Sequence, residues 1–350
     1  MNTVIKPTIA CHQVDSYRLD PSFIHSYAPN VGDVGLFEVL SPGKHRLIQN
    51  PQGANTYIYE GDHILAVFGN RYATKVFEGV VPVEPQTVYQ MLGRGGVIGS
   101  VRTAHSKIEE PTLLRQIAYA VDDKGQVLNT LYLRNQGSRF DPNRTFPGQV
   151  ILSVGTTMDS GKTTSAAYLA GGLKRAGFRV AYIKLTGTLF LKDTPFVLDR
   201  GADMAIDFSM FGYPSTYCCE LDELLDLHQS LLDATAPARP DYILIEIADG
   251  LLQRETHMLL SDPGFMRTVD EVLFSCSDSL GALGGLQVLA KLGITPFALS
   301  GLLTVSPLLV EETRAFVREP IFTIEELLEG PAVQLLLQRQ QSRSMELRRA

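Results

Sequence analysis

Apolar runs alternate with helical segments along the second half of the chain. The pattern predicts strands at Val150–Val154, Arg179–Lys184, Tyr242–Ile247, Val269–Ser275 and Pro296–Thr304, and helices at Lys162–Ala176, Glu220–Leu232, Leu280–Leu292, Ile324–Glu329 and Ala332–Arg349. Strands that are almost continuously apolar are buried on both faces, as in a parallel sheet covered by helices. This half therefore predicts an α/β domain with a mostly parallel sheet flanked by helices.

The first half of the chain has a different texture. Short β-rich runs alternate with turns that contain Gly, Asp and Asn. We predict strands at Val34–Leu40, Asn55–Tyr59, His63–Phe68, Lys75–Val81, Gly96–Val101 and Val127–Leu133, and a helix at Pro111–Val121. Many short strands at close spacing indicate a small barrel or sandwich. This half contains no recognisable catalytic motif.

A segment rich in Gly, Pro, Asn and Ser separates the two halves. It reads NQGSRFDPNRTFPG and spans Asn135–Gly148. Residues of these types interrupt regular structure. A chain of 350 residues is also long enough for about two domains. We therefore expect a β-rich domain at 1–140 and an α/β domain at 148–350.

Charge and composition restrict the classes of partner. Residues 1–145 carry a net charge of +1 and residues 146–350 a net charge of −8. An acidic surface repels a phosphate backbone, so we expect no nucleic acid partner. The sequence lacks an apolar run of roughly 18 residues, so we also expect no membrane span. With four scattered cysteines and no N-terminal signal pattern, a reduced, cytoplasmic location is the simplest expectation.

The most informative segment is SVGTTMDSGKTT, at residues 153–164, between a predicted strand and a predicted helix. This is the setting of a phosphate-binding (Walker A) loop. Glycines let the backbone curl around an anion, and the start of the helix contributes a positive dipole. Lys162 would reach the phosphates and Thr163 would bind Mg²⁺. The expected nucleotide-binding residues are Gly155, Thr156, Asp159, Ser160, Gly161, Lys162, Thr163 and Thr164.

The loop resembles that of dethiobiotin synthetases, which have five residues between the two glycines. Gly155, Thr156, Asp159 and the Gly161–Thr163 run match that form, whereas Thr157 stands where the family has Asp. Two further matches follow from the resemblance. Lys184 in AYIKLTG corresponds to a lysine that faces substrate and phosphate. Glu246 in ILIEIADG corresponds to a magnesium-binding glutamate, although Ile247 and Ala248 replace the usual glycine and alanine.

A second resemblance is to P-loop domains of unknown function that include D-glutamate N-acetyltransferase-like proteins. Thr186-Gly187 and Asp207-Phe208 are similar to segments of that family, which makes Asp207 a candidate metal ligand. The two resemblances cover about residues 148–305 and leave the first 135 residues unexplained. From resemblance alone we expect a homodimer.

Each candidate outside the loop has a structural alternative. Lys184 could be a solvated lysine, although ligands bind at the carboxyl ends of parallel strands. Glu246 could belong to a buried ion pair instead of a metal site, because a carboxylate within an apolar strand must be paired or bind metal. Asp199, Asp203 and Asp207 recur every four residues, so they could form one solvated face of a helix.

The residues together predict an Mg²⁺-dependent, ATP-binding P-loop protein. ATP is preferred over GTP because the chain lacks an Asn-Lys-x-Asp motif. We expect an ATP-dependent ligase or phosphotransferase that activates a small molecule, with Lys162, Lys184 and Glu246 as catalytic residues. Two other classes stay open. One is an ATPase switch regulated by a partner; the other is an acyltransferase or binding module whose loop holds another phosphate-bearing ligand, such as coenzyme A.

Overall fold

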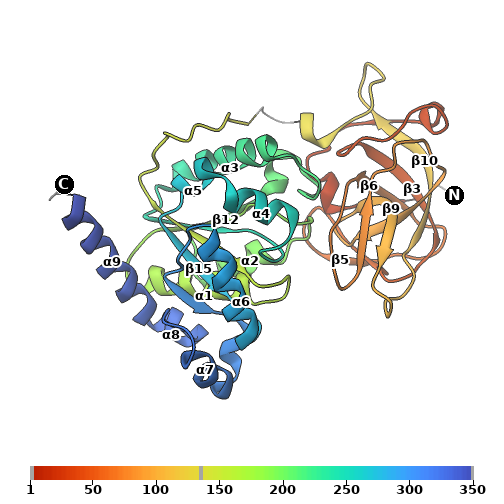
Figure 1. Cartoon of the computed structure of the whole chain (residues 1–350). Coiled ribbons are helices and arrows are strands. Elements are labelled where there is room, and N and C mark those ends of the chain that lie inside the picture. Colours follow the sequence, from red (N-terminus) through yellow and green to blue (C-terminus); the bar gives the residue numbers. More distant parts are fainter. Residues whose placement is uncertain (1–3, 134–136, 348–350) are drawn as a thin grey trace. The chain divides into compact units, whose positions relative to one another are not determined.

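The computed structural model describes residues 4–133 and 137–347, without the side chains of 343–347. Asn135, at the start of the predicted linker, and Arg349, at the end of the predicted last helix, lie outside these ranges. The chain forms two compact units (Figure 1). Unit 1 comprises Met1–Gly137 together with Thr186–Leu191 and Phe208–Cys219, and unit 2 comprises the rest of the chain. The boundary predicted between 140 and 148 stays a prediction.

Unit 2 is built on a parallel sheet. Its strands are β11 (Gln149–Gly155), β12 (Val180–Lys184), β13 (Met204–Asp207), β14 (Tyr242–Glu246), β15 (Glu271–Ser275) and β16 (Ala298–Ser300). Their order is β13-β12-β14-β11-β15-β16, and every pairing between them is parallel. The α/β class with a mostly parallel sheet is therefore confirmed.

Helices accompany this sheet along its length. They are α1 (Lys162–Arg175), α2 (Asp193–Arg200), α3 (Leu221–Thr235), α4 (Arg254–Ser261), α5 (Pro263–Arg267), α6 (Ser279–Lys291), α7 (Pro307–Arg314), α8 (Ile324–Glu329) and α9 (Pro331–Leu347). Short 3₁₀ turns lie at Ala236–Ala238 and Leu302–Val305. Within the described ranges, no helix combines the length and the apolar composition that crossing a membrane requires.

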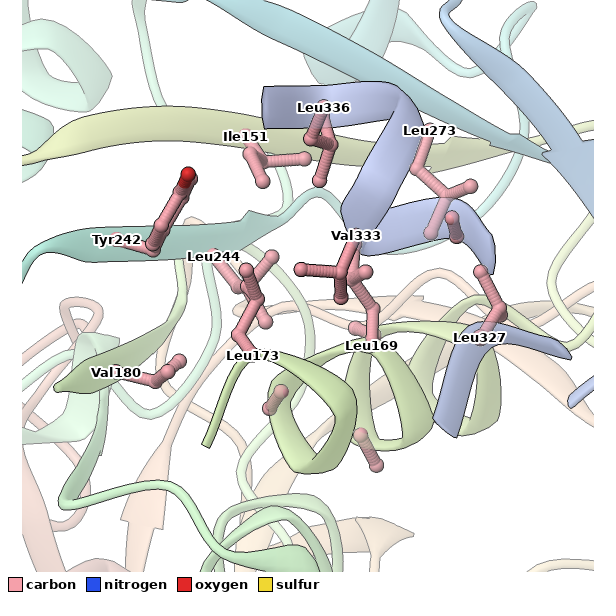
Figure 2. Packing of buried hydrophobic residues seen from close by; sticks show 14 of the residues in the cluster. Ile151, Leu169, Leu173, Val180, Tyr242, Leu244, Leu273, Leu327, Val333 and Leu336 are labelled. Carbon is pink, nitrogen blue, oxygen red and sulfur yellow. The ribbon is translucent and has the colours of Figure 1, made fainter. Parts of the chain in front are cut away.

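A single apolar cluster joins helices α1, α8 and α9 to the sheet (Figure 2). Leu169 and Leu173 of α1 face Leu244 of the sheet and Val333 of α9, and Leu327 of α8 belongs to the same cluster. Burying aliphatic side chains of this size contributes about 1.5–3 kcal/mol each. The cluster therefore fixes α1 on the sheet and, with it, the loop that precedes α1.

The topology places that loop at a branch point of the sheet. Strand β11 lies between β14 and β15. From β11 the chain continues to β12, on the β14 side of the sheet, and it later adds β15 and β16 on the other side of β11. In open parallel sheets, ligands bind beside the carboxyl ends of the strands at such a point. The segment that follows Gly155 at the end of β11 is therefore well placed for a ligand.

Unit 1 is a β structure. Its strands are β1 (Ile5–Pro7), β2 (Arg18–Asp20), β3 (Val34–Ser41), β4 (Leu47–Gln49), β5 (Asn55–Tyr57), β6 (His63–Phe68), β7 (Phe77–Val80), β8 (Val88–Gly93), β9 (Val97–Ala104) and β10 (Leu113–Val121). Strands β6, β3, β10, β8 and β9 pair in that order, and β9 returns to β6. This closed ring is a barrel, which was one of the two predicted forms.

Aromatic side chains fill the barrel. Phe37, Phe68, Tyr89 and Tyr119 are buried together, and their rings meet mostly edge to face. Such pairs stabilise a core beyond the area that they bury. The core thus draws on residues from β3, β6, β8 and β10.

The prediction of a helix at Pro111–Val121 is wrong. Leu113–Val121 forms strand β10, which pairs with β2, β3 and β8. Leu, Gln and Ala favour helices in isolation, but pairing on both edges and burial of Leu114 and Tyr119 outweigh that preference.

Two other predictions are also corrected. Val127–Leu133 is not a continuous strand: single bridges form at Val127 and Asn129, and the Asn129 side chain then caps a 3₁₀ turn at Thr130–Tyr132. The three aspartates at intervals of four do not share a helix face. Helix α2 ends at Arg200 before a left-handed Gly201, and Asp207 is the last residue of β13.

Two segments leave the ends of β12 and β13 and belong to unit 1. In the first, Leu191 exchanges two hydrogen bonds with the Gln49 side chain, at 2.7 and 2.9 Å. In the second, the Gly212 carbonyl accepts from Thr130 Oγ1 at 2.6 Å. A Cβ at Gly212 would lie 2.0 Å from the Thr130 carbonyl oxygen, so the approach requires glycine. Unit 1 is therefore completed by residues from the second half of the sequence.

Limited proteolysis tests this arrangement. Exposed Gly/Pro-rich segments are preferred cleavage sites, so we expect the first cut within 135–148. The two pieces should still elute together on size exclusion, because 186–191 and 208–219 remain hydrogen-bonded inside unit 1. Separate elution of the pieces without denaturant would contradict the two-segment completion of unit 1.

Candidate functional site

Two glycines shape the loop between β11 and α1. A Cβ at Gly155 would lie 2.1 Å from Ser160 Oγ, so only glycine allows this close approach. Gly161 has a φ of 96°, a left-handed conformation that glycine adopts without strain, and it is the N-cap of α1. The five-residue spacing between these glycines thus corresponds to a compact turn that ends directly at a helix.

The start of α1 presents unpaired backbone donors. In the described part of the chain, the N–H groups of Lys162, Thr163 and Thr164 have no hydrogen-bond acceptor, and the first helical bond runs from Ser165 N to the Gly161 carbonyl. Such donors, together with the helix dipole, attract anions. The loop therefore has the backbone chemistry that a phosphate requires.

Lys162 is buried over the loop. Its Nζ donates to the carbonyl oxygens of Thr157 at 2.8 Å, Met158 at 3.2 Å and Asp249 at 2.5 Å. Burial lowers the pKa of Lys162 to about 8, while the nearby carboxylates of Glu246 and Asp249 act in the opposite direction. The ammonium group is thus held at the loop by carbonyl dipoles and lies in the field of two carboxylates.

Glu246 ends β14 and is 2% exposed. Its Oε1 accepts from Thr163 Oγ1 at 2.9 Å and its Oε2 from Tyr182 OH at 2.8 Å. Both partners of the Glu246 carboxylate are hydroxyl groups, so these two contacts do not form the buried ion pair that was the structural alternative for Glu246. Burial, followed by the adjacent Glu246 charge, raises the pKa of Tyr182 well above its ordinary value, so its hydroxyl stays a donor.

The pair formed by Thr163 and Glu246 fits a magnesium ion. Hydroxyl and carboxylate oxygens are the hard donors that Mg²⁺ takes, usually together with water and substrate phosphates. Within the ranges that the structure describes, no group of three or more His, Cys, Asp and Glu side chains could hold a metal. A metal here would therefore depend on phosphate oxygens for further ligands.

Lys184 lies beside Glu246 at the same edge of the sheet. Lys184 of β12 is in register with Glu246 of β14 on one side and with Asp207 of β13 on the other. Its Nζ forms a largely buried ion pair with Asp193, the first residue of α2. The structure thus brings Lys162, Thr163, Lys184 and Glu246 to one region; the roles of Lys184 and Asp207 stay predictions.

The remaining predicted loop residues differ in their environment. Thr156 Oγ1 contacts the Ser277 hydroxyl at 3.1 Å, and Asp159 is exposed. The Ser160 side chain is fully buried against Gly155, so a contact from Ser160 to phosphate would have to come from its backbone. Thr164 is half-buried and lines a cavity.

The turn after β14 folds onto the loop. Leu251 N donates to the Gly155 carbonyl at 3.1 Å, and a Cβ at Gly250 would lie 2.4 Å from the Thr156 carbonyl oxygen. Asp249 adopts a left-handed φ of 63°, which aims its carbonyl at Lys162. This turn therefore couples the end of β14 to the lysine of the loop.

A cavity of about 320 Å³ adjoins the start of α1. Its lining comes from three segments: Gly161, Thr164 and Ser165 of the loop and helix, Gly301, Leu302, Thr304 and Val305 after β16, and Ile324 and Glu325 of α8. Ser165 is completely buried, and its hydroxyl has no partner within the described residues. The cavity thus combines apolar walls with hydroxyl and carboxylate groups, as small-molecule sites do.

Three residues with contacts to the site were missed by sequence reasoning. Tyr182 contacts Glu246 because of the register between two strands, and Asp193 contacts Lys184 because of the position of a helix. A single sequence reveals neither contact. Ser277 follows β15 and contacts Thr156. A tyrosine within an otherwise aliphatic strand, AYIK, was the one available signal.

No protein-family model matches the chain, and no curated protein matches it either. Solved structures are similar to parts of it. One is the signal recognition particle receptor FtsY from Elizabethkingia anophelis in complex with GDP, with 19% identity, a TM-score of 0.31, 49% of this chain and 53% of that chain. Another is FtsY from Mycoplasma mycoides, with 18% identity, a TM-score of 0.35, 55% of this chain and 65% of that chain.

A third similar structure is a DUF1611 family protein from Anabaena variabilis. It has 14% identity, a TM-score of 0.40, and coverage of 59% of this chain and 63% of that chain. The chain thus spans between half and two-thirds of the length of these three structures.

Lys162→Ala tests the phosphate loop. Loss of a charge-assisted contact to phosphate costs about 1.5–3 kcal/mol, so nucleotide affinity should fall roughly ten- to a hundredfold. Lys174→Ala is a matched control, because Lys174 lies on the same helix and forms an exposed ion pair with Asp203. If calorimetry finds that K162A binds ATP and ADP as tightly as K174A does, the phosphate-loop interpretation is wrong.

Glu246→Gln separates a metal site from a structural role. Gln keeps the shape and can still bond to both hydroxyls, so thermal stability should be equal or higher and nucleotide binding without magnesium near normal. Magnesium-dependent turnover should fall by about a hundredfold or more. Glu255→Gln is the contrast, because Glu255 is also buried but pairs with Arg254; this variant should lose stability and keep its turnover. Lower stability with undiminished turnover in E246Q would contradict the assignment.

Proposed function

We propose that unit 2 binds ATP with Mg²⁺ and uses it to phosphorylate or activate a small molecule. The observation that carries the proposal is the junction of β11 and α1. There, unpaired N–H groups, the Lys162 ammonium and the Thr163–Glu246 pair lie at the carboxyl edge of a parallel sheet. Anion donors, a cation and hard metal ligands in one place are the parts that phosphoryl transfer requires.

The loop residues would divide the work of holding the phosphates. The N–H groups of the first turn of α1 would bind phosphate oxygens, as at other helix N-termini. Lys162 would exchange its carbonyl partners for a phosphate oxygen, a stronger charge-assisted contact. Its lowered pKa is consistent with a lysine that gains from an anionic ligand.

Thr163 and Glu246 would hold the magnesium ion. A bound Mg²⁺ neutralises charge on the phosphates and orients them. Glu246 keeps Thr163 Oγ1 in place through the 2.9 Å bond, so the hydroxyl lone pairs are free for another ligand. These residues are sufficient for a site in which phosphate oxygens complete the coordination.

The cavity beside Thr164 would take the nucleoside. Its volume of about 320 Å³ falls within the lower range for small-molecule sites. It adjoins the first turn of α1, where the phosphates would bind. The preference for ATP over GTP rests on the absence of a guanine-reading motif from the sequence.

The acceptor group of the small molecule would lie near Lys184. This lysine ends β12 in register with Glu246, and its pairing with Asp193 fixes its direction. Positioning and charge stabilisation account for most of the catalysis in phosphoryl transfer. The resemblance adds two details to this proposal, a ligase similar to dethiobiotin synthetases and a homodimer. Composition adds a cytoplasmic location.

A turnover assay with a thermal-shift screen tests the proposal. A nucleotide at a hundred times its dissociation constant stabilises the folded state by about 2.7 kcal/mol, which raises the melting temperature by several degrees. ATP with Mg²⁺ should give this shift, and turnover should be rapid only with a metabolite. Slow turnover that a partner protein stimulates would favour the ATPase switch, and coenzyme A binding without turnover would favour the binding module.

A further inference from the structure

The hydroxyl of Tyr182 is the second anchor of Glu246. Tyr182 lies on β12, two residues before Lys184, and its side chain is fully buried within the apolar cluster. Its hydroxyl donates to Glu246 Oε2 at 2.8 Å, on the side of the carboxylate away from the Thr163 bond. One buried hydroxyl thus holds one carboxylate oxygen while the other oxygen meets the first turn of α1.

This arrangement leaves the carboxylate little rotational freedom. Oε2 is bound to strand β12 and Oε1 to helix α1, two elements that the same core cluster fixes. Without Tyr182, Oε2 would lose its partner in an interior where unpaired polar groups are costly. The carboxylate could then turn, and its contact with Thr163 would no longer be fixed.

We propose that Tyr182 is a positioning residue for the magnesium site: its hydroxyl fixes the Glu246 carboxylate so that Oε1 faces Thr163 and the metal. The inference rests on the proposed function, since it assigns a role within that site. Groups that orient metal ligands typically contribute ten- to a hundredfold to metal affinity. Tyr182 acts through Glu246 and does not itself touch nucleotide or metal.

The sheet offers a matched control. Tyr242 starts the neighbouring strand β14 and is also buried, in the apolar cluster that Figure 2 shows. Its hydroxyl donates to Gln340 Oε1 at 3.2 Å. Tyr242→Phe and Tyr182→Phe each remove one oxygen from a buried tyrosine in the same sheet. Only Tyr182 has a bond to the site.

The experiment measures the magnesium gain, which is the ratio of AMP-PNP affinities with and without Mg²⁺ by calorimetry. AMP-PNP is an ATP analogue that is not hydrolysed. Y182F should reduce the gain by about tenfold or more. Its metal-free affinity should stay within about twofold of wild type, which also shows that the loop is folded. Y242F should leave both quantities within about twofold. If Y182F does not fold, Y182M takes its place, because methionine adapts to irregular core space.

A double-mutant cycle adds a readout that a purely structural role would not move. If Tyr182 acts through Glu246, Y182F should have no further effect on the gain in an E246Q background. A gain in Y182F equal to that of wild type, or independent effects of Y182F and E246Q, overturns the positioning role alone. AMP-PNP binding without any magnesium gain in the wild type overturns the metal site together with Tyr182's role. Absence of AMP-PNP binding overturns the proposed function as well.

Discussion

A carboxylate buried at the end of a central strand constrains the whole site. Glu246 is almost fully enclosed, and a charge in such a place must be satisfied by strong donors. Two hydroxyls meet this need, one from β12 and one from α1, so the carboxylate of β14 ties together three elements of unit 2. The first turn of α1, strand β12 and the end of β14 are consequently held together at the site.

The sequence predicted those parts of the site that depend on local signals. Gly155, Gly161 and Lys162 lie within one short segment, and their spacing together with an apolar strand and a following helix was sufficient to locate the loop. Strand β13 was not predicted, and of the strand predicted at Pro296–Thr304 only Ala298–Ser300 forms β16. The other four strands of unit 2 were predicted to within two residues of their ends because each is a mostly apolar run. Here local composition and tertiary structure agree.

The parts that were missed depend on register. Tyr182 reaches Glu246 because of the register in which β12 pairs with β14. Asp193 reaches Lys184 because it is the first residue of α2. Neither relation leaves a mark in a single sequence. Strand β10 was mistaken for a helix for a related reason, since its partners β3 and β8 decide its conformation and its own residues do not.

The three-part composition of unit 1 has a consequence for the order of folding during synthesis. Domains generally fold as units, beginning from the N-terminus of the growing chain. Unit 1, however, includes Thr186–Leu191 and Phe208–Cys219, so its full set of contacts exists only after residue 219 has emerged from the ribosome. By then the strands β11, β12 and β13 have also been made. The barrel strands all precede residue 122 and can pair earlier, whereas the last contacts of unit 1 first become possible when the sheet of unit 2 still lacks β14, its strand between β12 and β11.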